Sequence, residues 1–316
     1  MPFIKIIVAG STGCLADHAL PAILNSTEPK FEVTVLTRAD SGKIKSIQGA
    51  SVVPVDYDDH PTLVRAVTGA DAIVSLVSGV SNKVVDQQLL AAAQEAGVRR
   101  IFPSEYTVDV LHPVGVSLLS ASGIWPDTMS PIPVARKFMA LANKNGPTSF
   151  TTIIPSAFID GWLEGGFSLF EPKRHRVTLI DGGDHYFTGC SLPFLAACIV
   201  AVLKMDEERT KNKRIHISEV RTTMNEIVSA YEEVTGTEFE KISLSAQAMM
   251  DQRDDMLKSG DLFPALFVSI QIAAFGGCGA GDLVDGLHFD GDSHLSVPRK
   301  NIKQITAEAA KKVSAA

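Results

Sequence analysis

The chain has 316 residues, of which 45% are hydrophobic and 21% charged, and its formal net charge is −7. This composition is globular and excludes a disordered or fibrous chain, and the length is sufficient for a full core. An acidic balance without a basic cluster argues against a nucleic-acid partner, and no apolar run approaches the ~18–20 residues of a membrane span.

The cysteines and histidines indicate the cellular compartment of the protein and whether it binds a metal. The four cysteines show no C-x-x-C spacing, and the N-terminus leads directly into an apolar strand. We therefore expect a cytoplasmic protein with reduced thiols and no secretory signal. The eight histidines form no H-E-x-x-H motif or close pair, so no metal site is predicted.

The first predicted strand is followed at once by a Gly-rich turn. Phe3–Ala9 is an apolar, β-branched run, the turn reads Gly10-Ser-Thr-Gly13-Cys-Leu-Ala16, and a helix is predicted over Asp17–Leu24. Strand, glycine turn and helix form the first half of a nucleotide-binding βαβ unit, in which the helix N-terminus faces a pyrophosphate. The alternative is a plain tight turn after a buried strand.

Further strands alternate with helices along the first half of the chain. The strands are predicted at Phe31–Leu36, Ser51–Val55, Ala72–Val77, Arg99–Phe102 and Ser149–Ile154, with helices at Pro61–Thr68, Val84–Ala96 and from Val134 to about Lys144. This order predicts an α/β fold with a doubly wound parallel sheet, of the Rossmann type, whose ligand lies beyond the carboxyl ends of the strands.

The later part of the chain is less regular. Two stretches, Thr107–Pro133 and Gly161–Phe170, are expected to be loops, and helices are expected at Ser191–Leu203, Thr223–Thr235 and Ser245–Lys258. Leu262–Phe275 is an apolar stretch. We predict an NADP-binding domain over 1–155 and a smaller substrate-binding lobe over 156–316, interleaved with the last strands of the sheet.

The end of the second strand indicates which dinucleotide binds. Arg38 stands where an acidic residue would accept from the ribose 2′-hydroxyl, and Lys43 follows closely. Cations at this place suit a 2′-phosphate, which predicts NADPH or NADP⁺ as the cofactor. The alternative is that Arg38 is an ordinary solvated residue.

Several motifs occur in the order typical of a known family. They are GSTGCLA, LTR, VDYDD, VSLVSG, AGVRRIFPSEY, a lysine on the next helix, TTIIPSAF and DGGDHYF. Together they resemble the isoflavone-reductase-like branch of the atypical short-chain dehydrogenases, which includes phenylcoumaran benzylic ether reductases. Within this branch the resemblance is closer to the fungal oxidoreductases. The NmrA-like regulators, which bind dinucleotide without known chemistry, share the fold.

The resemblance implies that Lys137 is the catalytic acid–base. None of the four tyrosines is followed four residues later by lysine, so the Tyr-x-x-x-Lys pair of other short-chain dehydrogenases is missing. A lysine beside a nicotinamide ring would be suited to proton transfer because desolvation and a cationic neighbour favour loss of its proton. The alternative is a solvated helix lysine.

The remaining site predictions follow from the strand ends and from the family. We expect the cofactor to be bound by Gly10, Thr12, Gly13, Cys14, Leu15, Arg38, Lys43, Val77, Ser78, Gly79, Ser104, Lys137, Pro155 and Phe158. The substrate is expected to contact Tyr106, Phe158 and Trp162, for which core packing is the alternative. Glu105 is expected to have a structural role.

The sequence thus predicts an NADPH-dependent oxidoreductase of secondary metabolism, acting on a small aromatic or polyketide-like metabolite as a monomer or homodimer. Hydride would pass from the nicotinamide to an electrophilic carbon, and Lys137 would supply the proton. The alternative is a non-catalytic NADP(H) sensor that binds a protein partner.

Overall fold

The computed structural model describes residues 2–39, 46–78, 82–119, 131–144, 146–165, 169–283 and 295–315. The chain forms two compact units. Unit 1 comprises Met1–Glu105, Asp127–Ile153 and Ala196–Ile215, and unit 2 comprises Tyr106–Pro126, Ile154–Leu195 and His216–Ala316. The sequence suggested one boundary at 155. The chain does change unit after Ile153, but it also does so at four other points.

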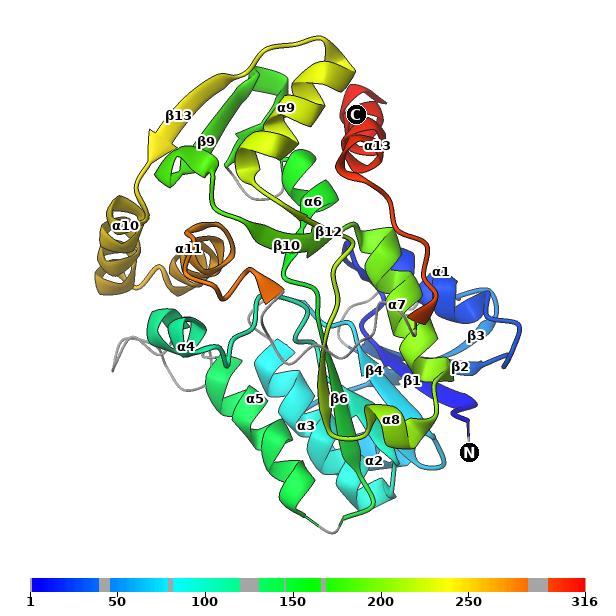
Figure 1. Cartoon of the computed structure of the whole chain (residues 1–316). Coiled ribbons are helices and arrows are strands. Elements are labelled where there is room, and N and C mark those ends of the chain that lie inside the picture. Colours follow the sequence, from blue (N-terminus) through cyan, green and yellow to red (C-terminus); the bar gives the residue numbers. More distant parts are fainter. Residues whose placement is uncertain are drawn as a thin grey trace. The chain divides into compact units, whose positions relative to one another are not determined.

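Unit 1 is built on a seven-stranded sheet with the strand order β11-β6-β5-β4-β1-β2-β3 (Figure 1). Neighbouring strands from β6 through β3 are parallel. The strands are β1 Lys5–Ala9, β2 Glu32–Arg38, β3 Ala50–Val55, β4 Ala72–Ser75, β5 Arg100–Phe102, β6 Ser149–Ile154 and β11 Lys213–His216. This sheet confirms the predicted doubly wound α/β fold, since parallel neighbours require crossover connections.

Helices cover both faces of this sheet, with α3 and α5 on one side and α7 on the other (Figure 1). The helices are α1 Ala16–Leu24, α2 His60–Val67, α3 Asn82–Ala96, α5 Pro131–Met139 with the 3₁₀ turn η2 Ala140–Asn143, α7 Leu192–Lys204 and α8 Glu207–Thr210. Apolar side chains of α2, α3 and α5 form one core with the alternate strand residues Ile7 and Ala9. The intervening Val8 is also fully buried, so strand β1 has apolar neighbours on both faces, as its sequence predicts.

Unit 2 contains two small sheets. One has the order β12-β10-β7 and the other β13-β9-β8. Their strands are β7 Ala157–Phe158, β8 Phe170–Glu171, β9 Arg176–Ile180, β10 Phe187–Cys190, β12 Val220–Thr222 and β13 Glu240–Leu244. The helices of the unit are α4 Pro113–Leu119, α6 Ile159–Leu163, α9 Met224–Thr235, α10 Ala246–Ser259, α11 Leu262–Phe275 and α13 Ile302–Ala315, with 3₁₀ turns η3 Pro172–Arg174 and η4 Asp181–Gly183.

The helices α7, α9 and α10 lie within one residue of the predicted ranges. The predicted loops are partly wrong, because α4 lies within the first of them and the end of α6 overlaps the second. In α4 the His112 side chain accepts from the Val114 N–H at 3.3 Å, and Pro113 occupies the first helical position, where its lack of an N–H has no cost. Leu118 joins the core of unit 2, which stabilises a helix that local sequence does not favour.

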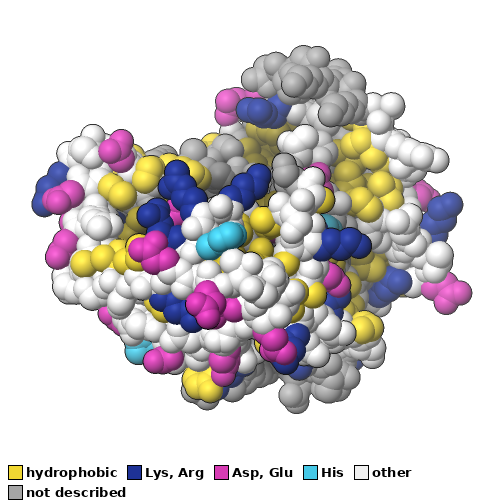
Figure 2. Space-filling model, turned by 90° about the horizontal axis from the view of Figure 1, so that it is seen from above, with side chains coloured by type: hydrophobic (Ala, Val, Ile, Leu, Met, Phe, Trp, Pro, Cys, Tyr) yellow, Lys and Arg dark blue, Asp and Glu magenta, His cyan; other side chains and the backbone are white. Residues whose placement is uncertain are grey.

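The described residues contain no helix with the length and apolar character needed to cross a membrane. Figure 2 shows acidic and basic side chains interspersed over the face that it draws.

Candidate active site

The Gly-rich turn brings the end of β1 against the segment that follows β4. Gly10 has a φ of 93°, and a Cβ built on it would lie 3.0 Å from the Leu76 carbonyl carbon and from the Val77 nitrogen. No side chain fits between two backbones at that distance. Gly10 therefore serves the packing of the turn as well as its direction.

Gly13 is a different case. Its φ of 132° also requires glycine, but the nearest atom to a Cβ would be the Ser78 Oγ at 3.6 Å. Among the described residues, a Cβ on Gly13 would thus meet this one oxygen at ordinary van der Waals distance and no backbone atom. A ligand can approach this backbone closely, which is what a pyrophosphate needs.

The N-terminus of α1 has no side-chain cap. Leu15 occupies the N-cap position, and its buried side chain cannot accept from the first N–H groups of the helix. The helical hydrogen bonds begin with Asp17 N–H to Gly13 C=O at 3.0 Å. Thr12 and Cys14 are exposed on the same turn. Such an N-terminus, with its partial positive charge, suits a phosphate.

The ends of β4 and β5 are tied together by Ser104. Its Oγ donates to the Val77 carbonyl at 2.7 Å, and its N–H donates to the Asp86 carboxylate at 2.9 Å. Asp86, on α3, is 1% exposed and joins the candidate site through this hydrogen bond, although it was not among the predicted residues. The sequence signal was present, because Asp86 shares a helical face with the buried Leu89, Leu90 and Ala93. Gly79 lies outside the described residues.

Arg38 is exposed at the end of β2, where it pairs in register with Val55 of β3. Two residues beyond Val55 lies the partly buried Tyr57. Burial raises the pKa of Tyr57 to about 12, Asp86 adds to the rise, and Arg38 opposes it. Arg38, Tyr57 and Asp86 therefore share one electrostatic neighbourhood at the carboxyl edge of the sheet. Lys43 lies outside the described residues.

Lys137 is exposed in the last turn of α5. Its Nζ donates to the Gln87 Oε1 at 3.2 Å. Gln87 follows Asp86 in sequence, so α3 carries both the hydrogen-bond partner of Lys137 and the residue that anchors Ser104. No motif in the sequence marks Gln87 as a site residue.

Glu105 ends unit 1 in a buried ion pair. It is 4% exposed and accepts from the Arg214 Nη1 at 2.6 Å. The side chain of Arg214 is only 12% exposed. The pair links the end of β5 to β11, which agrees with the structural role expected for Glu105.

The other predicted residues belong to unit 2. Tyr106 and Phe158 are partly buried, and Pro155 is buried. Trp162 is 1% exposed, with its ring 5.3 Å from that of Phe170 and 5.8 Å from that of Phe275. The indole is therefore part of the core of unit 2, as in the packing alternative, because a fully covered ring offers no surface to a substrate.

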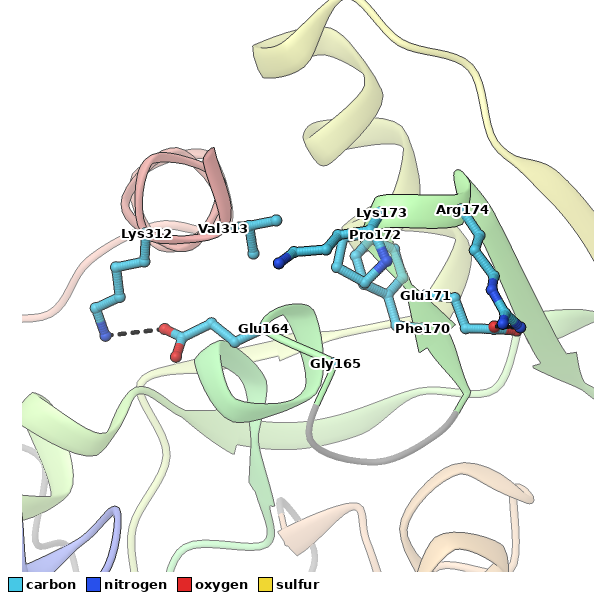
Figure 3. A pocket seen from close by; sticks show the side chains of 9 residues that line it. All are labelled: Glu164, Gly165, Phe170, Glu171, Pro172, Lys173, Arg174, Lys312 and Val313. Carbon is cyan, nitrogen blue, oxygen red and sulfur yellow. Dashed lines mark hydrogen bonds and ion pairs between the residues drawn. The ribbon is translucent and has the colours of Figure 1, made fainter. Parts of the chain in front are cut away.

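A separate hollow of about 460 Å³ lies within unit 2, between the end of α6, the turn after β8 and the last turn of α13 (Figure 3). Its two carboxylates are already paired. Glu164 accepts from Lys312 at 2.8 Å and raises the pKa of that lysine. Glu171 accepts from Arg174 and Arg176, which lower its pKa. None of the predicted substrate-binding residues lines this hollow.

Comparison with known proteins identifies the family. The model of the NmrA-like family matches residues 4–117. The bifunctional pinoresinol-lariciresinol reductase 2 of Linum usitatissimum is 30% identical over 79% of this chain and 78% of its own length. The chain belongs to the isoflavone-reductase-like branch of the NmrA-like family. This confirms the resemblance drawn from the motifs.

A further relative and two solved structures extend the match over nearly the whole chain. The oxidoreductase aprR of Aspergillus flavus is 28% identical over 98% of this chain and 99% of its own length. A solved structure of AtPrR2 with NADP⁺ and (+)-pinoresinol has a TM-score of 0.74 at 23% identity, covering 97% of this chain and 99% of its own. The leucoanthocyanidin reductase of Vitis vinifera in complex with NADPH has a TM-score of 0.74 at 15% identity, with the same coverage. As a member of this family, the chain is an oxidoreductase.

Proposed function

We propose that the chain is an NADPH-dependent reductase of a small aromatic or polyketide-like metabolite, with Lys137 as general acid. The observation that carries the proposal is that unit 1 holds both a glycine turn whose backbone a phosphate could approach and, on α5, an amine hydrogen-bonded to the helix that anchors Ser104. Relatives of known chemistry support it, since they are named reductases and oxidoreductases.

The residues of the turn fit a dinucleotide. A Cβ is excluded at Gly10, a Cβ at Gly13 would contact no described backbone atom, and the N-terminus of α1 lacks a side-chain cap. Backbone N–H groups of Thr12 to Leu15 would bind the pyrophosphate. Arg38, exposed at the end of β2, would pair with the 2′-phosphate. Val77, Ser78, Ser104, Pro155 and Phe158 complete the proposed cofactor set.

When bound, a reduced nicotinamide supplies a hydride from its C4 carbon. The protein has to supply the proton. Lys137, as an ammonium, can donate one to the oxygen of a carbonyl or quinone-methide-like substrate while the carbon accepts the hydride. Tyr106 and Phe158 are the residues proposed to contact the ring of the substrate. Trp162 is not included because its ring is buried.

The test is the Lys137→Ala variant assayed for NADPH oxidation with a panel of aromatic carbonyl and quinone-methide precursors. We expect turnover to fall by roughly two to four orders of magnitude, the usual contribution of general acid–base catalysis, with NADPH binding retained. Lys144→Ala is the matched control, because Lys144 is also an exposed lysine just beyond α5. Unchanged turnover in Lys137→Ala would remove Lys137 from the mechanism.

The sensor alternative predicts a different outcome, namely NADPH binding without turnover of any substrate in the panel. The reductase names of the relatives do not favour it.

A further inference from the structure

The amine of Lys137 meets a neutral amide, and we infer that Gln87 is a positioning residue that holds this amine in both of its protonation states. The inference rests on the proposed role of Lys137. Gln87 on α3 and Lys137 on α5 are 50 positions apart in sequence, and the fold joins them at 3.2 Å between Nζ and Oε1.

Gln87 is itself held in place by its neighbours on α3. Asp86 is 1% exposed and binds the Ser104 N–H at 2.9 Å. Gln88 donates to the Asp58 carboxylate at 2.6 Å. The main chain of Gln87 is thus fixed on both sides, and its partly buried side chain projects from an anchored point.

An amide is the side chain that suits an amine which gains and loses a proton. Its carbonyl oxygen accepts a hydrogen bond from the ammonium. After a half turn of the amide, its NH₂ group donates to the lone pair of the neutral amine. A glutamate could only accept, and its charge would favour the ammonium. A leucine could do neither.

Besides Lys137, the charged residues of these two helices are Lys83, Asp86 and Glu95 on α3 and Arg136 on α5. Asp86 comes directly before Gln87 on α3, and Arg136 comes directly before Lys137 on α5. Asp86 is committed to Ser104, whereas Arg136 is exposed. Glu95 is paired with His60 at 2.8 Å. The Lys137 amine donates to the neutral Gln87, so a substitution at Gln87 changes the charge at that contact.

The first measurement does not depend on catalysis. In the full chain without cofactor, the rate of Lys137 acylation by acetic anhydride is followed against pH by peptide mass spectrometry. In Gln87→Glu we expect the pH of half-maximal acylation at Lys137 to rise by about one unit, the effect of a surface ion pair on an amine. In Gln94→Glu we expect no shift, because Gln94 is exposed elsewhere on the same helix. Equal profiles in the two variants would overturn the inference.

The second measurement separates positioning from folding. In Gln87→Leu we expect kcat to fall roughly tenfold through loss of orientation, with the KM for NADPH unchanged. In Gln87→Glu the high-pH limb of the kcat profile should move upward together with the acylation profile. A Gln87→Leu variant with the kcat of the parent would overturn the positioning role.

The two proposals can fail separately. If Lys137→Ala keeps full turnover, the catalytic role of Lys137 is wrong, and the acylation profile still reports whether Gln87 contacts the amine. If Lys137→Ala loses turnover while Gln87→Glu leaves the acylation profile unmoved, Lys137 is catalytic and Gln87 does not position it.

Discussion

Replacement of Gly10 by alanine tests whether the turn after β1 is built by backbone packing. The new Cβ would lie 3.0 Å from the Leu76 carbonyl carbon and the Val77 nitrogen and 3.1 Å from the Leu76 oxygen. All three atoms are backbone, so none can move away by a side-chain rotation. The φ of 93° adds the strain of an L-residue in a left-handed conformation.

The expected loss in the free energy of unfolding is the sum of the backbone strain and the steric overlap. Left-handed backbone costs an L-residue about 1–2 kcal/mol, and forced overlap in a packed region costs typically 1–3 kcal/mol more. We therefore expect Gly10→Ala to lower the free energy of unfolding by roughly 2–5 kcal/mol. Gly69→Ala is the matched control in the same unit, because its φ is 80° and nothing lies within 4 Å of the new Cβ. It should lose only about 1–2 kcal/mol.

Urea unfolding followed by circular dichroism measures both losses, and NADPH fluorescence measures binding. Gly13→Ala extends the series: its φ of 132° lies farther than the 80° of Gly69 from the left-handed region that an L-residue can adopt, so Gly13→Ala should lose more stability than Gly69→Ala, and its NADPH affinity should fall as well. If Gly10→Ala loses no more stability than Gly69→Ala, the close approach of the two backbones does not govern the turn, and the reasoning is refuted.

Three further changes test the surroundings of the site. Arg38→Ala should weaken NADPH by roughly tenfold or more, as expected for a lost charge-assisted contact, with little effect on NADH; equal losses in two titrations would contradict the 2′-phosphate assignment. Glu105→Gln should lower the free energy of unfolding by about 3–5 kcal/mol because Arg214 stays buried without its carboxylate, and a loss below about 1 kcal/mol in urea would exclude that role. Tyr57 has a pKa of about 12 in the folded chain and 10.0 as its ordinary value, so the native state keeps a proton that the unfolded chain loses. Stability should therefore fall as pH rises from 10 towards 12, and Tyr57→Phe should remove that part of the fall in alkaline unfolding curves.

The sequence alone was sufficient to predict those helices and strands that are determined by residues within the same segment. The four residues Ile6–Ala9 before Gly10 are all apolar and buried, which is typical of a strand covered on both faces. The capping box of Thr223 and Glu226 marks the start of α9 within the chain itself. The order of the motifs was sufficient to predict the family, and the resemblance to that family predicted Lys137 as the catalytic residue.

Tertiary structure decided what depends on residues far apart in the chain. The buried Asp86 acquires its role only because Ser104 lies 18 positions away in sequence and at 2.9 Å in space. The assignment of Trp162 to the core depends on Phe275 from a distant helix, and α4 is stabilised by packing that its own sequence does not reveal. Composition and periodicity indicate which side chains are buried and where the backbone turns, because burial pattern and turn residues are properties of one segment. The partner of a side chain is a property of two segments, so the pairing of Lys137 with Gln87 required the fold.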